Sequence, residues 1–204
     1  MHFPGTVKLV SSSQDEDEAV ELLDRESLIG FDSESKVRGL NEPRSPPCLV
    51  QLSSANNCFI WRLSSPEVPT ALKYILENKS LVKVSQGAIG EVTSLAYNFD
   101  KLKPSGFLCI YNIASSLRCH PRSLQGLVGI FLKRYLDKSL CVSDWTAPVL
   151  SDDQLNYAAT DAYSSLQVLH AMRSAFRVDV LPQEILVDSV NLGVHAKSPV
   201  FKVS

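Results

Sequence analysis

Two carboxylates follow an apolar segment with a spacing that suits metal binding. Residues 28–31 are Leu-Ile-Gly-Phe, and Asp32 and Glu34 come directly after them. In an extended strand, residues two apart point to the same side, so both carboxylates project from one face. Side by side they repel unless a positive charge lies between them, and a divalent cation is the usual solution. The alternative is a solvated strand end.

A phenol and a third carboxylate lie on one stripe of a predicted helix. Ser151 and Gln154 have the spacing of a capping box, which predicts a helix start. Tyr157 and Asp161 then stand at i and i+4, one above the other. On such a stripe the acid can hold a metal while the phenol orients a water. A surface tyrosine beside a surface aspartate is the simpler alternative.

A fourth acidic residue follows a predicted strand over 81–85. Glycines at 87 and 90 separate this strand from Glu91, where a helix over 90–99 is expected to begin. An acid in a first helical turn is stabilised by the helix dipole, so Glu91 alone indicates no chemistry.

Together, the order and spacing of these signals resemble the DEDD superfamily of 3′–5′ exonuclease domains. The resemblance is to the subgroup with tyrosine in the third motif, which includes Werner-syndrome-type exonuclease domains, ribonuclease D and the proofreading domains of family A DNA polymerases. It covers about residues 6–173. The matching segments are Gly30–Glu34, Pro47–Ser53, Lys83–Glu91, Ser123–Val128, Leu136–Ser139, Ser143–Trp145, Leu150–Gln154 and Tyr157–Tyr163.

The resemblance implies two-metal hydrolysis with Mg²⁺ or Mn²⁺, which prefer oxygen ligands. Asp32 is then the bridge between both ions, and Glu34 and Asp161 complete the site of the water-activating ion. Glu91 serves the second ion, directly or through water, and Tyr157 orients the attacking water. The implied reaction removes nucleoside 5′-monophosphates from the 3′ end of a single strand.

Glu91 stands where the family usually has aspartate. Glutamate keeps the charge but moves the carboxylate by about one C–C bond, whereas catalytic geometry tolerates roughly 0.5 Å. A second hypothesis is therefore a catalytically weak or inactive module of the same fold that binds RNA or a protein partner.

Basic residues beside the motifs are candidate contacts for backbone phosphates. Lys36 and Arg38 follow the first motif, and His120 and Arg122 lie in a basic loop. Solvated loops are the alternative for all four, because charged residues often simply face water.

The elements that must position these residues indicate an α/β fold. A strand, a helix and a three-stranded meander precede alternating strands and helices. By resemblance we expect a ribonuclease H-like mixed sheet of about five or six strands, flanked by helices on both faces. Strands are expected at 6–10, 27–32, 48–53, 58–62, 81–85 and 107–110, and helices at 11–23, 68–76, 90–99, 123–132 and 151–173. We expect the exonuclease-like domain to span 1–177, and leave open whether 178–204 forms an edge strand or a partner arm.

Composition limits the other possibilities. The 204 residues carry a formal net charge of −2, so no overall basic field indicates purely electrostatic nucleic-acid binding. No signal peptide or membrane-spanning segment is predicted. The five cysteines are scattered without a CxxC pair, which favours reduced thiols inside the cell, in nucleus or cytoplasm. The sequence leaves open RNA or DNA as substrate, and a homo-oligomer or a protein partner.

Overall fold

A mixed sheet of seven strands forms the centre of the computed structural model, which describes residues 1–37, 45–63, 67–99, 101–176 and 186–188. The strand order is β1-β4-β3-β2-β5-β6-β7. The strands are β1 (Thr6–Leu9), β2 (Leu28–Ser35), β3 (Pro47–Ser53), β4 (Asn57–Arg62), β5 (Val82–Ser85), β6 (Phe107–Cys109) and β7 (Leu186–Val187). The predicted α/β class and mixed sheet are confirmed.

Strand β2 lies at the middle of this sheet and connects its two halves. It pairs antiparallel with β3, where Asp32 is opposite Gln51, and parallel with β5. Strand β5 in turn pairs parallel with β6. The carboxyl ends of β2, β5 and β6 therefore meet at one edge of the sheet, where open α/β sheets place their ligands.

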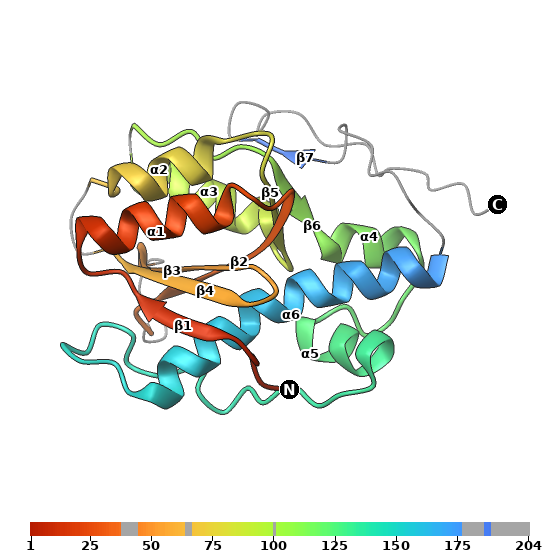
Figure 1. The fold of residues 1–204 in the computed structure, drawn as a ribbon. Coiled ribbons are helices and arrows are strands. Elements are labelled where there is room, and N and C mark those ends of the chain that lie inside the picture. Colours follow the sequence, from red (N-terminus) through yellow and green to blue (C-terminus); the bar gives the residue numbers. More distant parts are fainter. Residues whose placement is uncertain (38–44, 64–66, 100, 177–185, 189–204) are drawn as a thin grey trace.

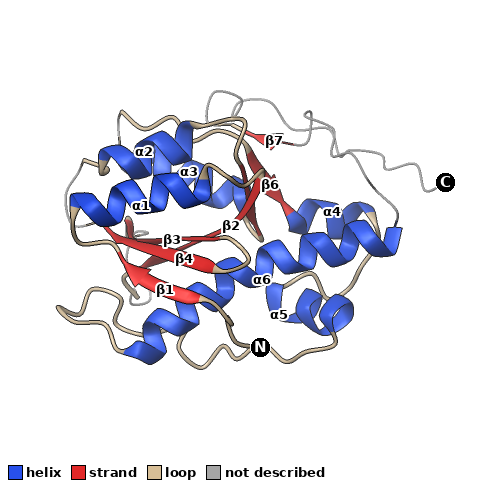
Figure 2. Ribbon diagram, viewed as in Figure 1, coloured by secondary structure: helices blue, strands red, loops and turns tan. Residues whose placement is uncertain are grey.

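Helices cover both faces, as predicted (Figure 1). On one face lie α1 (Ser13–Leu23), α2 (Thr70–Glu77) and α3 (Ala88–Asn98), and on the other lies the long α6 (Asp152–Phe176). Two shorter helices, α4 (Ile110–Ser116) and α5 (Leu124–Leu127), and a π-helical turn at Val128–Leu132 pack against the second half of α6 (Figure 2).

The start of α6 is fixed by the predicted capping box. The backbone N–H of Gln154 donates to the Ser151 hydroxyl at 3.2 Å, and the Ser151 N–H donates to the Gln154 side chain at 3.0 Å. Near its middle, α6 also holds the N-terminal segment, because the N–H of Phe3 donates to the Thr160 hydroxyl at 3.0 Å. These contacts set where α6 begins and how it lies across the sheet.

Gly30 allows α6 to approach β2 closely. A Cβ atom at Gly30 would lie 2.0 Å from the carbonyl oxygen of Ala162, far inside van der Waals contact. Because Ala162 follows Asp161, this close crossing brings α6 to the strand that carries Asp32.

Three details differ from the sequence expectation. The seventh strand, β7, pairs antiparallel with β6 and exceeds the expected five or six. Helix α4 begins directly after β6, where no helix was predicted. The predicted helix over 123–132 is a short α-helix that continues as a π-helical turn. Of the segment 178–204, only residues 186–188 are among those described, so its boundary at 177 lies outside them. None of the described helices combines the length and apolarity needed to cross a membrane.

Candidate active site

Three carboxylates converge at the edge of the sheet where β2 ends. Asp32 and Glu34 come from one face of β2, and Asp161 comes from α6, which crosses that face. One oxygen from each can be chosen so that all three lie within 4.8 Å of one another. Asp32 and Glu34 are half-buried, whereas Asp161 is only 2% exposed. The structure thus brings together residues that are about 130 positions apart in the chain.

The electrostatics of this cluster favour a cation. Burial, and then the negative charge of Asp161, raises the pKa of Asp32 well above its usual value and that of Glu34 to about 8. Asp161 Oδ1 is buried without a hydrogen-bond partner among the described residues. Crowded carboxylates with a free oxygen are the donor set that Mg²⁺ and Mn²⁺ prefer, so the residues fit a divalent ion.

Lys138 partly neutralises the cluster. Its ammonium group donates to Asp161 Oδ2 and, at 3.3 Å, to the Tyr157 hydroxyl, and it lies 5.3 Å from the centre of the Tyr157 ring. In the sequence, this lysine falls within the segment Leu136–Ser139 that resembles the family, where it was assigned no catalytic role. Its contact with Asp161 joins residues 23 positions apart, across the irregular segment that precedes α6, so no local spacing signals it.

Tyr157 is held as a neutral phenol. It is 8% exposed, and its ring lies 5.8 Å from that of buried Trp145. Burial, followed by the charges of Asp161 and Glu34, raises the pKa of Tyr157. The hydroxyl therefore keeps its proton at physiological pH and can orient a water or a phosphate oxygen by hydrogen bonding.

Glu91 lies beside this cluster and outside the group of three. It sits in the first turn of α3, where its Oε2 accepts a hydrogen bond from the hydroxyl of Ser33 on β2. Burial raises the pKa of Glu91 to about 7, and the bond from Ser33 opposes that rise. Its charge also raises the pKa of Asp32. The structure therefore groups three of the four predicted metal ligands. The fourth, Glu91, lies outside that group and is hydrogen-bonded to Ser33.

Three of the four predicted phosphate contacts lie among the described residues. Lys36 is exposed after β2. Arg122 donates to the Ser115 hydroxyl at 2.6 Å and lies 5.0 Å from the ring centre of Tyr111. His120 is exposed two residues earlier, and Arg38 falls outside the described residues.

The Arg122 loop is tied to the end of β5, because Gln86 Nε2 donates to the Arg122 carbonyl at 3.1 Å. Since Glu91 follows Gln86 by five residues, this loop borders the same edge of the sheet as the carboxylates.

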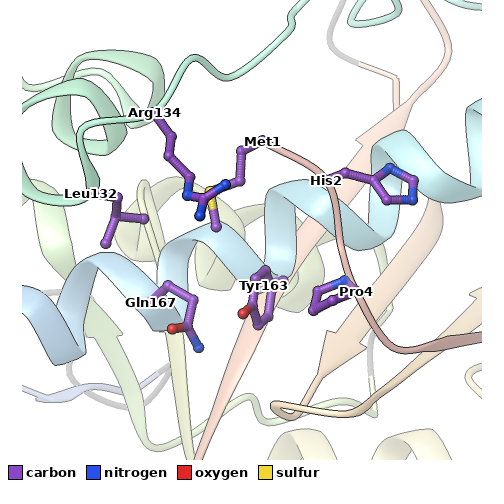
Figure 3. A pocket seen from close by; sticks show the side chains of 7 residues that line it. All are labelled: Met1, His2, Pro4, Leu132, Arg134, Tyr163 and Gln167. Atoms are coloured by element: carbon purple, nitrogen blue, oxygen red, sulfur yellow. The ribbon is translucent and has the colours of Figure 1, made fainter.

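The structure also contains a cavity of about 320 Å³. Figure 3 shows the side chains that line it. Tyr163 and Gln167 line it from α6, opposite Arg134 and the first residues of the chain. They follow Asp161 by two and six residues, which places them roughly 200° and 240° around the helix from it. This cavity is therefore not part of the carboxylate site.

Comparison with known proteins identifies the class that this fold and site define. The family model described as 3′-5′ exonuclease matches residues 7–177. The chain therefore belongs to the 3′–5′ exonuclease family, with the tyrosine-containing third motif of the DEDD type.

Individual relatives agree with this assignment. The chain is 36% identical to the bifunctional 3′-5′ exonuclease/ATP-dependent helicase WRN of Mus musculus, over 81% of this chain and 12% of that protein. It is 31% identical to exonuclease 3′-5′ domain-containing protein 2 of Homo sapiens, over 83% of this chain and 30% of the relative. The chain is 28% identical to ribonuclease D of Gluconacetobacter diazotrophicus, over 78% of this chain and 40% of that protein. The chain thus spans less than half the length of these relatives.

Solved structures share the fold at lower identity. The EXO domain of Aedes aegypti Nibbler superposes with a TM-score of 0.71 at 21% identity, covering 86% of this chain and 90% of that one. Escherichia coli RNase D superposes with a TM-score of 0.69 at 20% identity, covering 85% of this chain and 47% of that one. These likenesses confirm the ribonuclease H-like exonuclease fold.

Proposed function

We propose that this protein is a metal-dependent 3′–5′ exonuclease that hydrolyses a single nucleic-acid strand, RNA or DNA, and releases nucleoside 5′-monophosphates. The observation that carries the proposal is the convergence of Asp32, Glu34 and Asp161 within 4.8 Å in a chain of the exonuclease family. We assign the activity to residues 1–177 and treat 178–204 as an extension.

The carboxylates of Asp32, Glu34 and Asp161 would hold one Mg²⁺ or Mn²⁺, with Asp32 shared between two ions. Glu91 would contribute to the second ion through water, since one oxygen of its carboxylate already accepts a hydrogen bond from Ser33. When bound, such ions supply a water of lowered pKa and stabilise the charge of the leaving oxygen.

The remaining steps belong to the chain itself. The Tyr157 phenol keeps its proton and would orient the attacking water against the phosphate. Lys138 lies beside both Tyr157 and Asp161, where its ammonium would face the negative phosphate oxygens once a substrate is bound. Lys36, Arg38, His120 and Arg122 would hold the backbone phosphates further along the strand, because net binding charge must come from a local patch in a chain of charge −2.

The test is an incubation of 3′-labelled and 5′-labelled oligonucleotides, of RNA and of DNA, with Mn²⁺, with Mg²⁺ and with a chelator. We expect mononucleotide release from the 3′ end with either ion and none with chelator. Asp32→Asn should lower the rate by about 10³-fold or more, and Glu91→Ala by about 10²-fold, the scale of single groups that stabilise transition-state charge. Glu91→Asp should keep or raise the rate.

The position of Glu91 favours one second candidate, a module of this fold that binds RNA or a protein without cleaving it. In that case the wild type releases no nucleotides with either ion, and the variants at Asp32 and Glu91 retain nucleic acid as well as wild type does. If Glu91→Asp then restores trimming, the extra methylene of Glu91 is what silences the site.

A further inference from the structure

A buried amide in β3 has no hydrogen-bond partner. Gln51 is 0% exposed, and neither its Nε2 nor its Oε1 bonds to any group in the described part of the chain. Such a side chain destabilises a fold, because its donors and acceptor lose water and gain nothing. An unpaired buried amide therefore calls for a specific explanation.

The register of the sheet places this amide next to the metal-binding carboxylates. Gln51 stands directly opposite Asp32 in the antiparallel β2–β3 pair. Residues directly opposite one another point to the same face, with Cβ atoms about 4.5–5.5 Å apart. That face is the one which α6 covers with Asp161.

The other neighbours of Gln51 within the sheet are mostly apolar. On the opposite flank, β4 places Ile60 across from it, and Leu49 lies two residues away on the same face of β3. Both are fully buried in the same apolar cluster as Ala158 and Ala159 of α6. The hydroxyl of Ser53, the other residue two positions away, already donates to the Ser54 carbonyl. The carboxylate of Asp32 is thus the polar group that the amide faces across the ladder.

We propose that Gln51 is a positioning residue for Asp32, donating a hydrogen bond from Nε2 to the Asp32 carboxylate when that carboxylate holds a cation. The inference rests on the metal site of the proposed function. Hydrogen bonds to the groups that ligate a metal fix their orientation, and their loss typically weakens metal binding about 10- to 100-fold. A neutral amide can do this without cancelling the negative charge that the cation needs, in contrast to the ammonium of Lys138.

This role makes a prediction that a purely structural role does not. Gln51→Met keeps the length and approximate volume of the side chain but removes the unpaired amide. Without metal it should raise the melting temperature, by roughly 2–8 °C for a domain of this size. With metal it should weaken Mn²⁺ binding by about 10- to 100-fold.

The experiment measures Mn²⁺ binding by calorimetry and melting temperature in chelator, on the full chain. Leu52→Met is the matched control, because Leu52 is the next residue of β3, equally buried, and packs in the cluster on the opposite face of the sheet. It should leave Mn²⁺ affinity unchanged. Gln51→Leu repeats the test with a second apolar side chain should Gln51→Met not fold.

The outcomes separate the inference from the proposed function. Unchanged Mn²⁺ affinity in a folded Gln51 variant overturns the role of Gln51 and leaves the exonuclease proposal standing. If wild type binds Mn²⁺ and cleaves nothing, the exonuclease proposal fails, while a weakened affinity in Gln51→Met still supports the inference. If wild type binds no Mn²⁺, both are overturned. In an active enzyme, the loss of rate in Gln51→Met should shrink as Mn²⁺ approaches saturation.

Discussion

On the face of the sheet under α1, α2 and α3, side chains such as Phe31, Val50 and Phe59 pack in an apolar cluster. Lys83 is also buried there, but its ammonium donates to the Asn78 carbonyl at 2.6 Å. The face under α6 instead buries an unpaired amide and a carboxylate with a free oxygen. Among the residues described, the first face leaves one buried donor unpaired, the indole N–H of Trp61 within the apolar cluster. The second face leaves unpaired polar atoms on Gln51 and Asp161 at the carboxylate cluster itself, a cost in stability that is expected where a site must bind a ligand.

Among the changes that test this comparison of the two faces, the largest effect is expected from closing the gap between α6 and β2. Gly30→Ala puts a methyl group 2.0 Å from the Ala162 carbonyl, so α6 must move and carry Asp161 with it. A shift of about 1 Å at a reacting group can cost about 10²-fold in rate. We expect at least that loss in oligonucleotide cleavage, with weaker Mn²⁺ binding. Gly129→Ala is the control, since its new methyl group would meet no atom within 4 Å. A wild-type rate in Gly30→Ala would contradict the close crossing.

A cavity created by substitution on the face under α1, α2 and α3 should lower the stability of the fold and leave metal binding unchanged. Phe59 is 1% exposed in the apolar cluster, and Phe59→Ala should cost about 3–5 kcal/mol in the free energy of unfolding. Urea denaturation measures this loss, and calorimetry on the folded variant should give the wild-type Mn²⁺ affinity. A changed affinity would show that the two faces are not independent.

The carboxylate cluster should make the metal-free protein less stable as pH rises. A carboxyl group whose pKa is raised on folding binds its proton more tightly in the folded state, so ionisation opposes folding. For Glu34 this window runs from the ordinary value of 4.5 to about 8. The melting temperature in chelator should therefore fall by several degrees across it. Glu34→Gln should flatten the fall, and Mn²⁺ at pH 8 should reverse it. A pH-independent melting temperature would argue against the crowding of these groups.

The smallest effect is expected at Lys138, which is about one third exposed and therefore screened by water. Lys138→Met should cost about 1 kcal/mol in chelator, because Asp161 loses a charged hydrogen-bond donor. The rise in melting temperature on adding Mn²⁺ should then be larger than in wild type. Lys133→Met, an exposed lysine of the same segment, should change neither quantity. Equal behaviour of the two variants would remove Lys138 from the site.

What the sequence predicts here depends on how local the signal is. Asp32 and Glu34 share a strand face, and Tyr157 and Asp161 share a helix stripe, so spacing alone pairs them. The capping box at Ser151 likewise fixes the start of α6 from four residues. Their meeting in space was predicted through family resemblance, because no local pattern links β2 to α6.

The features that were not predicted depend on packing between distant segments, so no short stretch of sequence indicates them. Helix α4 is seven residues long, too short to be stable in isolation, and Cys109 before it provides no side-chain cap. Gln51 is one polar residue within an apolar strand, and only the β2–β3 register reveals that it faces Asp32. Glu91 was predicted as a ligand from its place in the motif, but its bond to Ser33 depends on how α3 packs against β2.

The long separation between β2 and α6 also has a consequence for how the chain matures on the ribosome. Asp32 emerges about 130 residues before Asp161, which at 5–20 residues per second corresponds to roughly 6–26 s of synthesis. During that interval the strands can pair, but Leu49 and Ile60 on the uncovered face have no helix to pack against. The nascent sheet therefore presents apolar surface until α6 arrives, and the same late event that completes the carboxylate cluster also ends the period of greatest exposure to aggregation.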